Sequence, residues 1–416
     1  MSDTPVKSSP RLNVDEALVQ LAKKVKPKLK IETLATANSL GRFLVDDIHA
    51  PINLPPFTSS AMDGYAVRHH DLRPPCQLPV QGTSAAGHPY PDKVKENHCV
   101  RIFTGAQLPT GADTVLLQEN VNRLENSIKI ENSVDAGANV RQIGHDVALG
   151  NLLLPAKSCV NNFSQAWLTA CGISEVQTFA KPKIALFSTG DELKNVGEPL
   201  LPGQIYDGNR SVIKSLLAHL PVEIIDLGII ADDQESIEQT ITTAAQTVDA
   251  IITSGGVSVG EADFVRQALE ARGSLDFWKL NLKPGKPFAY GQVGDHCHFF
   301  GLPGNPISTI ITLLLIVKPA LQQLCGGNLQ RPIHFPATAN NEFLHSRGRD
   351  EYQRGRYLNI QSNGHSELRV ETTGDQSSNR FASFNNADCL VWIEKDRGSV
   401  EPGEKVNTLP LANLIF

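Results

Sequence analysis

The segment Asp249-Ala-Ile-Ile-Thr-Ser-Gly-Gly-Val-Ser-Val-Gly-Glu-Ala-Asp263 constrains the fold of this chain more than any other. A short run of β-branched apolar residues ends before Gly255 and Gly256, which predicts a buried parallel strand, a tight turn and then a helix. Backbone N–H groups that converge in such a turn, beside the N-terminus of a helix, bind anions such as phosphate. Glu261 and Asp263 would repel a bare phosphate, so the segment indicates phosphate together with a divalent metal ion. Glycines also serve such turns without any ligand, and the segment alone leaves both interpretations open.

The composition bounds the class of protein. With 416 residues, 41% of them hydrophobic and 20% charged, the chain is long enough for two to four domains with their own cores. A formal net charge of −6, an isoelectric point near 6.1 and the absence of long basic runs argue against a nucleic-acid partner. The start of the chain has no apolar signal region, and the longest aliphatic run, 310–317, is shorter than the roughly 20 residues of a membrane span. We therefore expect no membrane association.

The cysteines indicate the redox compartment. There are seven, scattered along the chain, and no two of them form a C-x-x-C pair. This pattern argues against a disulfide framework and against a zinc knuckle. We expect a cytoplasmic protein.

The first part of the chain divides into helical and β-rich stretches. Asn13 followed by Glu16 has the pattern of a capping box and predicts an amphipathic helix directly after Asn13. A second helix is expected over 33–47. From 51 to 141 the sequence predicts a β-rich insert, because Pro, Gly and Asn clusters separate short β-prone pieces. These pieces lie at 65–68, 100–103, 114–118 and 127–130.

Between 183 and 325 strands and helices alternate. Strands are expected at 184–188, 223–230 and 250–253 and again before Pro303, with helices after Asp207, after Asp232 or Asp233, and after Gly260. Asn305 as N-cap and Pro306 at the first helical position start the last helix. This alternation predicts a doubly wound, mostly parallel sheet, with ligands in the crevice at the carboxyl ends of its strands.

Beyond Arg331 the pattern returns to strands, at 358–361, 368–372 and 390–394, which predicts a small C-terminal β-barrel. The expected fold class is a multidomain α/β protein, with a doubly wound, mostly parallel α/β domain, a β-rich insert and a small C-terminal β-barrel. The expected domains are an N-terminal helical and linking domain at 12–50 and 142–180, the insert at 51–141, the α/β domain at 181–330 and the barrel at 331–416.

Three short segments place polar side chains where a ligand can reach them. Asp63 precedes a glycine, so it is a turn residue or a ligand, and composition alone favours the turn. Thr104-Gly ends a strand in a loop that either holds an anion or simply connects a hairpin. Asp191 and Glu192 follow the first strand of the α/β domain, where carboxylates either cap a helix or face the crevice.

A lysine-rich stretch follows. Lys279, Lys283 and Lys286 lie within eight residues, with prolines and a glycine that restrict the backbone. Lysine runs usually cover a solvated face, but apolar residues interleave this one, which favours a strand that carries the ammonium groups towards an oxyanion in the crevice. The glycine-flanked loops 347–355 and 373–379 offer donors that suit a tetrahedral oxyanion, although exposed loops are commonly polar without any ligand.

Ordered blocks of sequence carry a family resemblance. They are Ser60-Ala-Met-Asp-Gly-Tyr-Ala66, Thr104-Gly, Gly144-His-Asp-Val147, Ser188-Thr-Gly-Asp-Glu192, Gly203-Gln-Ile-Tyr-Asp207, the segment 253–263, Lys283-Pro-Gly-Lys-Pro287 and Gly301-Leu-Pro-Gly-Asn-Pro306. Together they resemble the molybdopterin molybdenumtransferase family, which includes the bacterial MoeA proteins and the gephyrin E domain. The resemblance covers the chain from about residue 12 to its end.

The resemblance implies an activity and an assembly. The implied reaction takes adenylylated molybdopterin and molybdate, releases AMP and yields molybdenum cofactor, with a divalent cation, usually Mg²⁺. The implied assembly is an elongated homodimer of four-domain subunits. Its active-site cleft combines the α/β and barrel domains of one subunit with the β-rich insert of the other. A contact with the adenylyltransferase that supplies the intermediate is also expected.

The resemblance also assigns residues to roles. Asp63 and Thr104 are expected in the wall that one subunit lends to the other, while Glu192, Asp232 and Asp263 hold the metal and the pyrophosphate-like linkage. Glu192 and Asp263 are the expected metal ligands. Lys279 and Lys283 complete the implied catalytic set. The implied binding residues are Gly255, Gly256, Ser258, Lys286, Pro287, Pro303, Pro306, Arg354 and Ser378. The family usually has a glycine beside this serine, whereas the chain has Ser377-Ser378-Asn379, so which hydroxyl faces molybdate stays open.

Two other functions are weighed against this one. A molybdopterin adenylyltransferase shares the α/β domain, but its single-domain layout lacks the insert and the barrel. A non-enzymatic scaffold of the gephyrin E type binds a receptor peptide near its dimer interface. The retained acidic and lysine positions favour the enzyme.

Overall fold

The computed structural model describes residues 11–27, 30–257, 264–362 and 365–415. The chain forms two compact units. Unit 1 comprises Met1–Glu32, Gly41–Phe43 and Thr178–Phe416, and unit 2 comprises Thr33–Leu40 and Leu44–Gln177. The four-domain division stays a prediction, since each unit contains parts of more than one of those domains.

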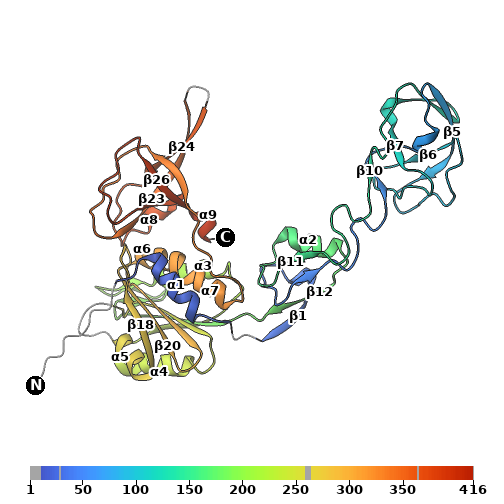
Figure 1. Ribbon diagram of the computed structural model, residues 1–416. Helices are drawn as coiled ribbons and strands as arrows, with labels where there is room; N and C mark the ends of the chain where they lie inside the picture. The colour runs from blue at the N-terminus through green and yellow to red at the C-terminus, as the bar shows by residue number, and fades with distance from the viewer. Residues whose placement is uncertain (1–10, 28–29, 258–263, 363–364, 416) are drawn as a thin grey trace, which may run out of the picture. The chain divides into compact units, whose positions relative to one another are not determined.

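Unit 1 contains a six-stranded sheet (Figure 1). Its strand order is β16 (Glu223–Ile230), β13 (Lys183–Thr189), β17 (Ala250–Ser254), β21 (Cys297–Leu302), β20 (Pro287–Val293) and β18 (Gly273–Lys279). The first four strands pair in parallel, and antiparallel pairings add β20 and β18. The prediction of a mostly parallel sheet is confirmed, and the antiparallel edge was not foreseen.

Two helical layers cover the two faces of this sheet. One apolar core holds α1 (Val14–Lys24), α3 (Gly208–Leu217), α6 (Pro306–Thr312) and α7 (Lys318–Leu324), and the other holds α4 (Gln234–Ala244) and α5 (Phe264–Arg272). Figure 1 shows the two groups of helices on opposite sides of the strands. Strand β13 serves both cores, because Ile184 and Leu186 pack into the first and Ala185 and Phe187 into the second. Successive side chains of a strand point to opposite faces of the sheet. A central parallel strand with helices on both faces therefore needs apolar side chains on both.

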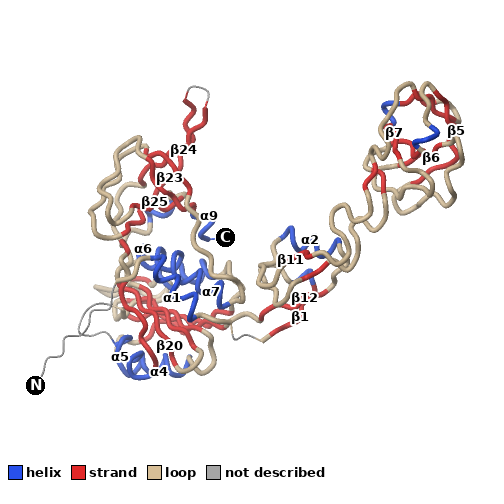
Figure 2. Tube along the Cα trace, in the orientation of Figure 1, coloured by secondary structure: helices blue, strands red, loops and turns tan. Residues whose placement is uncertain are grey.

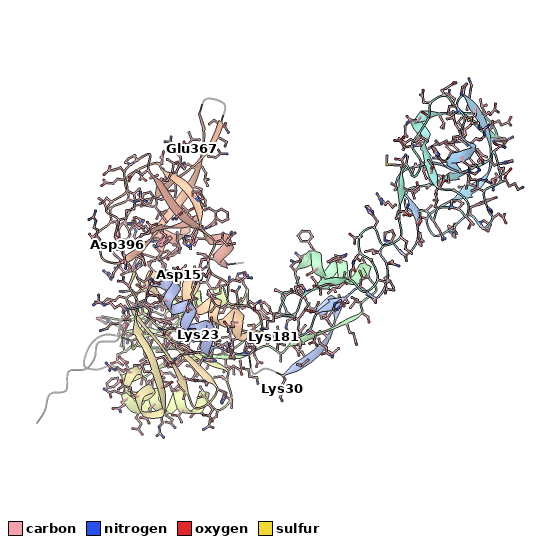
Figure 3. All side chains as sticks on the ribbon, in the orientation of Figure 1. Asp15, Lys23, Lys30, Lys181, Glu367 and Asp396 are labelled. Atoms are coloured by element: carbon pink, nitrogen blue, oxygen red, sulfur yellow. The ribbon has the colours of Figure 1, made fainter. Side chains whose placement is uncertain are left out.

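Local signals set where helix α1 begins. The Asn13 side chain accepts a hydrogen bond from the Glu16 backbone N–H at 2.8 Å, and the Glu16 carboxylate accepts from the Asn13 N–H at 2.9 Å. The predicted capping box is therefore confirmed. Leu18 is buried, whereas Asp15 and Lys23 lie exposed on the same helix (Figure 3).

A long apolar helix forms the centre of the first core. A π-helical turn, η4 (Leu313–Val317), joins α6 to α7, so the helix runs without a break from Pro306 to Leu324. Its length and composition alone would allow it to cross a bilayer, but 94% of its apolar window is buried. Pro306 follows the N-cap residue Asn305, as predicted. This helix is apolar on all sides because it is buried in the core.

The C-terminal part of unit 1 is a closed β-barrel. Its strands are β22 (Phe335–Ala339), β23 (Asp350–Ser362), β24 (His365–Thr372), β25 (Cys389–Ile393) and β26 (Lys405–Pro410). Pairing of β23 with β25 closes the ring, so the predicted barrel is confirmed. The short strand β19 (Leu282–Lys283) joins β23 in parallel. The remaining elements are the pair β14 (Leu193–Lys194) and β15 (Ile205–Tyr206), with helices α8 (Ala382–Asn385) and α9 (Leu411–Ile415).

In unit 2 strands and loops predominate (Figure 2). Its main sheet has the order β7 (Thr114–Leu117), β4 (Gly64–Val67), β6 (Cys99–Ile102), β5 (Cys76–Ser84), β9 (Ser127–Ile130) and β8 (Val121–Arg123). Smaller pairs join β2 (Ile48–His49) to β11 (Leu152–Leu154) and β3 (Ser59–Ser60) to β10 (Val140–Arg141), beside α2 (Asn162–Ala170). Short 3-10 turns are η2 (His69–Asp71) and η3 (Gln118–Asn120). The four predicted strands of the insert are confirmed within about one residue.

The helix predicted over 33–47 is wrong. The chain instead forms strand β1 (Ile31–Ala35), which pairs with β12 (Glu175–Phe179), and then the single turn η1 (Thr36–Asn38). The Thr36 backbone N–H donates to the Ser174 carbonyl at 2.8 Å, and its hydroxyl donates to the Ile173 carbonyl at 2.6 Å. Long-range pairing therefore satisfies this backbone without a helix, and local periodicity cannot reveal it.

A matched pair of leucines tests the two-sided core. Leu186 on β13 is fully buried, whereas Leu201 is 64% exposed in the same unit. We expect Leu186→Ala to lower the free energy of unfolding by about 2–5 kcal/mol, and Leu201→Ala to change it by less than about 0.5 kcal/mol. Denaturant unfolding followed by tryptophan fluorescence in a Trp167→Phe background reports on unit 1 alone, since Trp278 and Trp392 both belong to it. Equal effects of the two substitutions would contradict the assignment of β13 to the core.

Candidate active site

The parallel strands of the sheet end together. Thr189 at the end of β13 lies opposite Ile230 of β16, and Ser254 at the end of β17 lies opposite both Ser188 and Leu302. Residues that follow these strands therefore share one edge of the sheet. This is the edge at which open α/β sheets bind their ligands.

After β17, the backbone conformation and the close packing require glycine at two positions. Gly255 has φ +93°, and a Cβ added to it would lie 2.5 Å from the carbonyl oxygen of Thr189. Gly256 has φ +70°, and its added Cβ would lie 2.8 Å from a methyl group of Val265. The Gly255 N–H donates to the Leu302 carbonyl at 3.2 Å, which ties this turn to the end of β21. The backbone thus passes close to both neighbouring strands.

Several predicted residues in this turn lie outside the described part of the chain. They are Ser258, Glu261 and Asp263. Their roles stay predictions.

The adjacent carboxylates Asp232 and Asp233 have different partners. Asp233 caps helix α4 by accepting from the Ser236 N–H at 2.9 Å, and that backbone hydrogen bond lowers the pKa of the Asp233 carboxyl. Asp232 instead accepts from the Thr189 hydroxyl at 2.8 Å, at the end of β13. The structure therefore resolves which of the two starts the helix, and it leaves Asp232 at the ligand-bearing edge.

Glu192 lies just beyond the same strand end. Its carboxylate folds back over Gly190, where an added Cβ would meet Oε2 at 2.6 Å. Gly190 adopts φ +151°. Glu192 makes no ion pair within the described residues, so its charge is available to a ligand.

Asn209, which was not among the predicted residues, connects two strand ends. Its side-chain N–H groups donate to the Ser254 hydroxyl at 2.9 Å and to the Gly304 carbonyl at 2.7 Å. Asn209 lies in the first turn of α3, two residues after the N-cap residue Asp207. The only signal in the sequence was that Asn209 follows the cap residue Asp207, at the edge of the sheet where ligands are expected.

Arg210 extends this network to the acidic loop. Its guanidinium donates to Asp207 at 3.0 Å, to Asp226 at 2.8 Å and to the Asn195 side chain at 2.6 Å, in the loop after Glu192. Partial burial acts to raise the pKa of Asp226, but hydrogen bonds from Lys214 and Arg210 lower it to about 2. The loop that carries Glu192 is therefore held by charged hydrogen bonds.

The three predicted lysines come from one connected segment. Lys279 ends β18 and lies opposite Pro287 of β20, and the Leu280 N–H donates to the Lys286 carbonyl at 3.0 Å. Lys283 alone of the three has a carboxylate partner among the described residues, Glu351, at 3.0 Å. The structure thus brings the lysines to one segment while giving them different surroundings.

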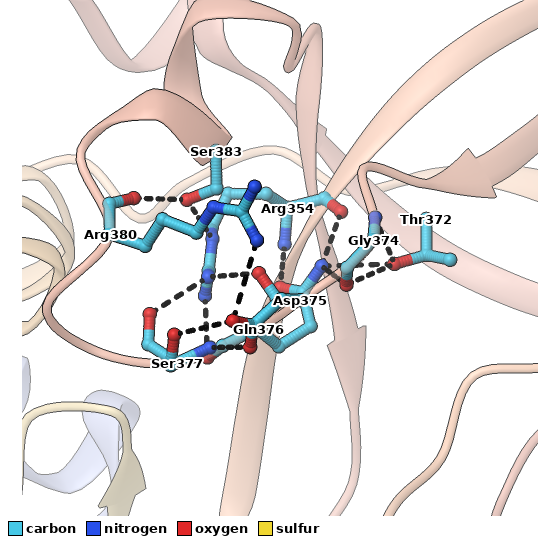
Figure 4. Close-up of polar contacts among 8 residues, drawn as sticks. All are labelled: Arg354, Thr372, Gly374, Asp375, Gln376, Ser377, Arg380 and Ser383. Atoms are coloured by element: carbon cyan, nitrogen blue, oxygen red, sulfur yellow. Dashed lines mark hydrogen bonds and ion pairs between the residues drawn. The ribbon is translucent and has the colours of Figure 1, made fainter.

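Arg354 holds a loop (Figure 4). This arginine is fully buried, and its guanidinium donates to the carbonyl oxygens of Asp375, Gln376 and Ser377 at 3.1–3.3 Å and to the Ser383 hydroxyl at 3.0 Å. Burial lowers the pKa of Arg354 to about 10. The guanidinium is therefore engaged with the protein, which differs from the expected direct contact with an oxyanion.

The loop held by Arg354 leads to the predicted serine. The Ser377 hydroxyl donates to Asp375 at 3.0 Å, whereas the Ser378 carbonyl accepts from the Ile307 N–H at 3.0 Å. Ser378 thus lies beside the first turn of α6, next to Pro306. Because the Ser377 hydroxyl already has a carboxylate partner, Ser378 is the better candidate for a ligand contact.

Asp63 and Thr104 meet in unit 2. Both the backbone N–H and the hydroxyl of Thr104 donate to one oxygen of Asp63, at 2.8 and 2.7 Å, and these bonds lower the pKa of that carboxyl. The Arg101 guanidinium lies over the rings of Tyr65 and Phe103, at 5.1 and 4.8 Å from their centroids. The other described site residues belong to unit 1.

No group of three or more possible metal-ligating side chains occurs within the ranges that the structure describes. Glu192 and Asp232 supply carboxylate oxygens at adjacent strand ends, and neither has a basic partner there. Such oxygens are the donors that a hard divalent cation prefers. Pro303 joins β21 to α6, so the predicted prolines flank the same edge of the sheet.

Comparisons with known proteins cover nearly the whole chain. Family models match residues 12–172 (MoeA N-terminal region, domain I and II), 185–323 (probable molybdopterin binding domain) and 336–411 (MoeA C-terminal region, domain IV). A molybdopterin molybdenumtransferase from Haemophilus influenzae is 39% identical, over 97% of this chain and 100% of the relative. A gephyrin from Dictyostelium discoideum is 30% identical, over 91% of this chain and 59% of the relative. The crystal structure of a molybdopterin biosynthesis MoeA protein from Pyrococcus horikoshii is 27% identical, with a TM-score of 0.80 over 96% of this chain and 100% of that one.

Substitution of two glycines separates backbone strain from steric contact. Gly294 has φ +60° with open space around an added Cβ, so Gly294→Ala is expected to lower the free energy of unfolding by about 1–2 kcal/mol. Gly255→Ala adds a clash with the Thr189 carbonyl and should cost about 1–3 kcal/mol more. Thermal unfolding of both variants gives the comparison. If both variants lose the same free energy of unfolding, β13 must move away from the turn to make room for the methyl group added at position 255.

Proposed function

The chain belongs to the MoeA family of molybdopterin molybdenumtransferases, and from this premise we propose that it inserts molybdate into adenylylated molybdopterin and releases AMP. The chain is thus a transferase of molybdenum cofactor biosynthesis. The observation that carries the proposal is similarity along the full length, including the insert and the barrel as well as the α/β domain. A single α/β domain, as in an adenylyltransferase, would match only the middle of the chain.

The strand-end geometry supports a place for each reactant. We place the phosphate linkage of the adenylylated pterin beside the turn at Gly255 and Gly256, where backbone N–H groups that follow Gly255 can face it, since the Gly255 N–H itself is bonded to Leu302. Lys279, Lys283 and Lys286 supply positive charge for phosphate and molybdate oxygens. Ser378 completes the molybdate pocket with its hydroxyl. Pro287, Pro303 and Pro306 shape the walls between these groups, and Arg354 acts by holding the loop that carries Ser378.

We assign the metal to the acidic side of the same edge. Glu192 and Asp263 are proposed as ligands of Mg²⁺, with Asp232 beside them at the phosphate linkage. A bound divalent cation reduces the negative charge that opposes attack on a phosphoanhydride. Held by Thr189, Asp232 stays oriented towards this side of the crevice.

The assembly and its partners follow from the family resemblance. We propose a homodimer in which Asp63 and Thr104 of one subunit complete the site of the other. The adenylylated intermediate would come from an adenylyltransferase that contacts this protein in the cytoplasm. A purely scaffolding role of the gephyrin E type predicts peptide binding without metal-dependent turnover, which separates it from the enzyme.

The decisive measurement is AMP release from adenylylated molybdopterin, with and without molybdate and Mg²⁺. Release that needs both additions supports the proposal. AMP release at the same rate with and without molybdate, or no release under any condition, would refute it. A parallel series with tungstate measures which oxyanion is preferred.

Removing charge from the acidic side should abolish most turnover. We expect Glu192→Gln and Asp232→Asn each to lower kcat by about 10²-fold or more, because each removes a preorganised charge at the reacting linkage. Folding should be unchanged, since side-chain volume is conserved.

The matched control for this experiment is Asp233→Asn. It removes a neighbouring charge, but asparagine still caps α4, so turnover should stay near that of the wild type. If Glu192→Gln and Asp232→Asn also keep wild-type AMP release at saturating Mg²⁺, the assignment of the acidic side is wrong.

Mixed dimers test the shared site. An Asp63→Ala subunit and a Glu192→Gln subunit are each expected to be inactive as homodimers. Mixing them should restore part of the activity, because a mixed dimer contains one intact site. Sedimentation of a monomer at assay concentration, or no recovery on mixing, would contradict the shared site.

A further inference from the structure

We infer that Glu351, in the barrel, is a positioning residue for the reaction, and that it acts by fixing the ammonium group of Lys283. The inference rests on the role proposed above for Lys283. Glu351 was not among the residues that the sequence indicated. Its place in the fold, rather than any motif, points to this role.

Strand pairing brings the two residues face to face. β19 runs parallel to β23, with Leu282 opposite Asp350 and Lys283 opposite Glu351. The Lys283 Nζ donates to Glu351 Oε2 at 3.0 Å. The lysine comes from the segment between β18 and β20 of the sheet, and the carboxylate comes from the barrel. The pair therefore joins the lysine-rich segment to a second domain.

Burial makes this pair different from a surface ion pair. The Glu351 side chain is 4% exposed, whereas the Lys283 side chain is 41% exposed. A buried carboxylate without a cation is costly, so Glu351 keeps the ammonium group close. An ammonium has three donors, and this bond uses one of them. The others stay available on the open side, where an oxyanion can reach them.

The carboxylate is itself fixed by the barrel. His345, whose side chain is fully buried, lies with Nε2 3.8 Å from the same Glu351 oxygen. Its Nδ1 lies 2.9 Å from the Arg397 carbonyl oxygen, and its Nε2 lies 3.1 Å from the Arg349 carbonyl oxygen. The ring is thereby held between two backbone carbonyl oxygens of the barrel. The histidine thus fixes the strand end that presents Glu351.

The neighbouring lysines lack such support. Neither Lys279 nor Lys286 has a carboxylate within salt-bridge distance in the described chain. Nearby, an added Cβ at Gly285 would lie 2.8 Å from the Thr312 hydroxyl, so the backbone between Lys283 and Lys286 is closely packed. Of the three ammonium groups, the one on Lys283 is therefore the preorganised one, and preorganised charge contributes most to stabilising a transition state.

Glu351→Gln tests this role through a split between kcat and KM. The variant keeps the shape of the side chain and the charge of Lys283, but it removes the charge that fixes the ammonium. We expect kcat for AMP release to fall about ten- to a hundredfold, as for a group misplaced by about 1 Å. The KM for molybdate should change by less than about threefold, since the lysine can still attract an anion. If Glu371→Gln lowers kcat and kcat/KM as much as Glu351→Gln does, the cause is a general defect of the barrel instead.

Glu371→Gln is the matched control because it makes the same change in the same domain. Glu371 pairs with Arg356 on the barrel surface, away from the lysine segment, and its loss should leave both constants near those of the wild type. Thermal unfolding of both variants checks that they are folded. If Glu351→Gln does not fold, Glu351→Asp replaces it, because aspartate keeps the buried charge but withdraws it from the ammonium.

A double-mutant cycle with Lys283→Met decides between the inference and its premise. If Glu351 acts through Lys283, the substitution at Glu351 should lower kcat no further in the Lys283→Met background. An equal loss in both backgrounds would overturn the inference and leave the proposed function intact. If Lys283→Met itself leaves kcat unchanged, the role proposed for Lys283 fails, and with it the premise.

Discussion

Burial of β13 and β17 on both faces is the constraint on which the rest of unit 1 depends. Apart from the exposed Lys183 at the start of β13, every residue of these two strands is buried, so the strands present no polar side chain to solvent along their length. Polar and charged residues are therefore confined to the ends of the strands. The parallel register places those ends at one edge. The two helical layers thus determine where chemistry can occur before any site residue is considered.

The edge is then shaped by side chains that bond other groups of the protein. Asn209 holds the ends of β17 and of the loop after β21, Arg210 holds the loop after Glu192, and Arg354 holds the loop that leads to Ser378. Asn209 and Arg354 donate to hydroxyl and carbonyl oxygens, and Arg210 donates to side-chain oxygens. Loops that carry ligand-binding groups need this support, since they have no strand pairing of their own. In the proposed function, this support holds the groups assigned to molybdate in place.

Much of this architecture was predictable from local sequence, and the exceptions share a cause. The capping box at Asn13, the N-cap at Asn305 and the strands expected at 184–188, 223–230, 250–253, 358–361, 368–372 and 390–394 depend on residues close in the chain, and these predictions were confirmed. The helix predicted over 33–47 failed because Thr36 bonds residues more than a hundred positions away. The oxyanion contact expected of Arg354 stays a prediction, but the burial of its guanidinium by residues 375–383 could not be inferred from spacing. Asn209 and Glu351 were missed for the same reason, since their partners lie far along the chain.

Negative and positive charges at the strand-end edge come from different segments of the chain. Among the described residues, Asp232 accepts from the Thr189 hydroxyl and Glu192 has no ion-pair partner, so no basic side chain occupies either carboxylate. The lysine segment provides the opposite sign, and Glu351 offsets part of that charge while fixing its position. A site that contained only free lysines would bind any oxyanion, including sulfate and free phosphate, through charge alone. Partial neutralisation with fixed geometry weakens such non-selective attraction and leaves shape to discriminate between anions. In the proposed function, selectivity between oxyanions therefore depends on the barrel as much as on the sheet.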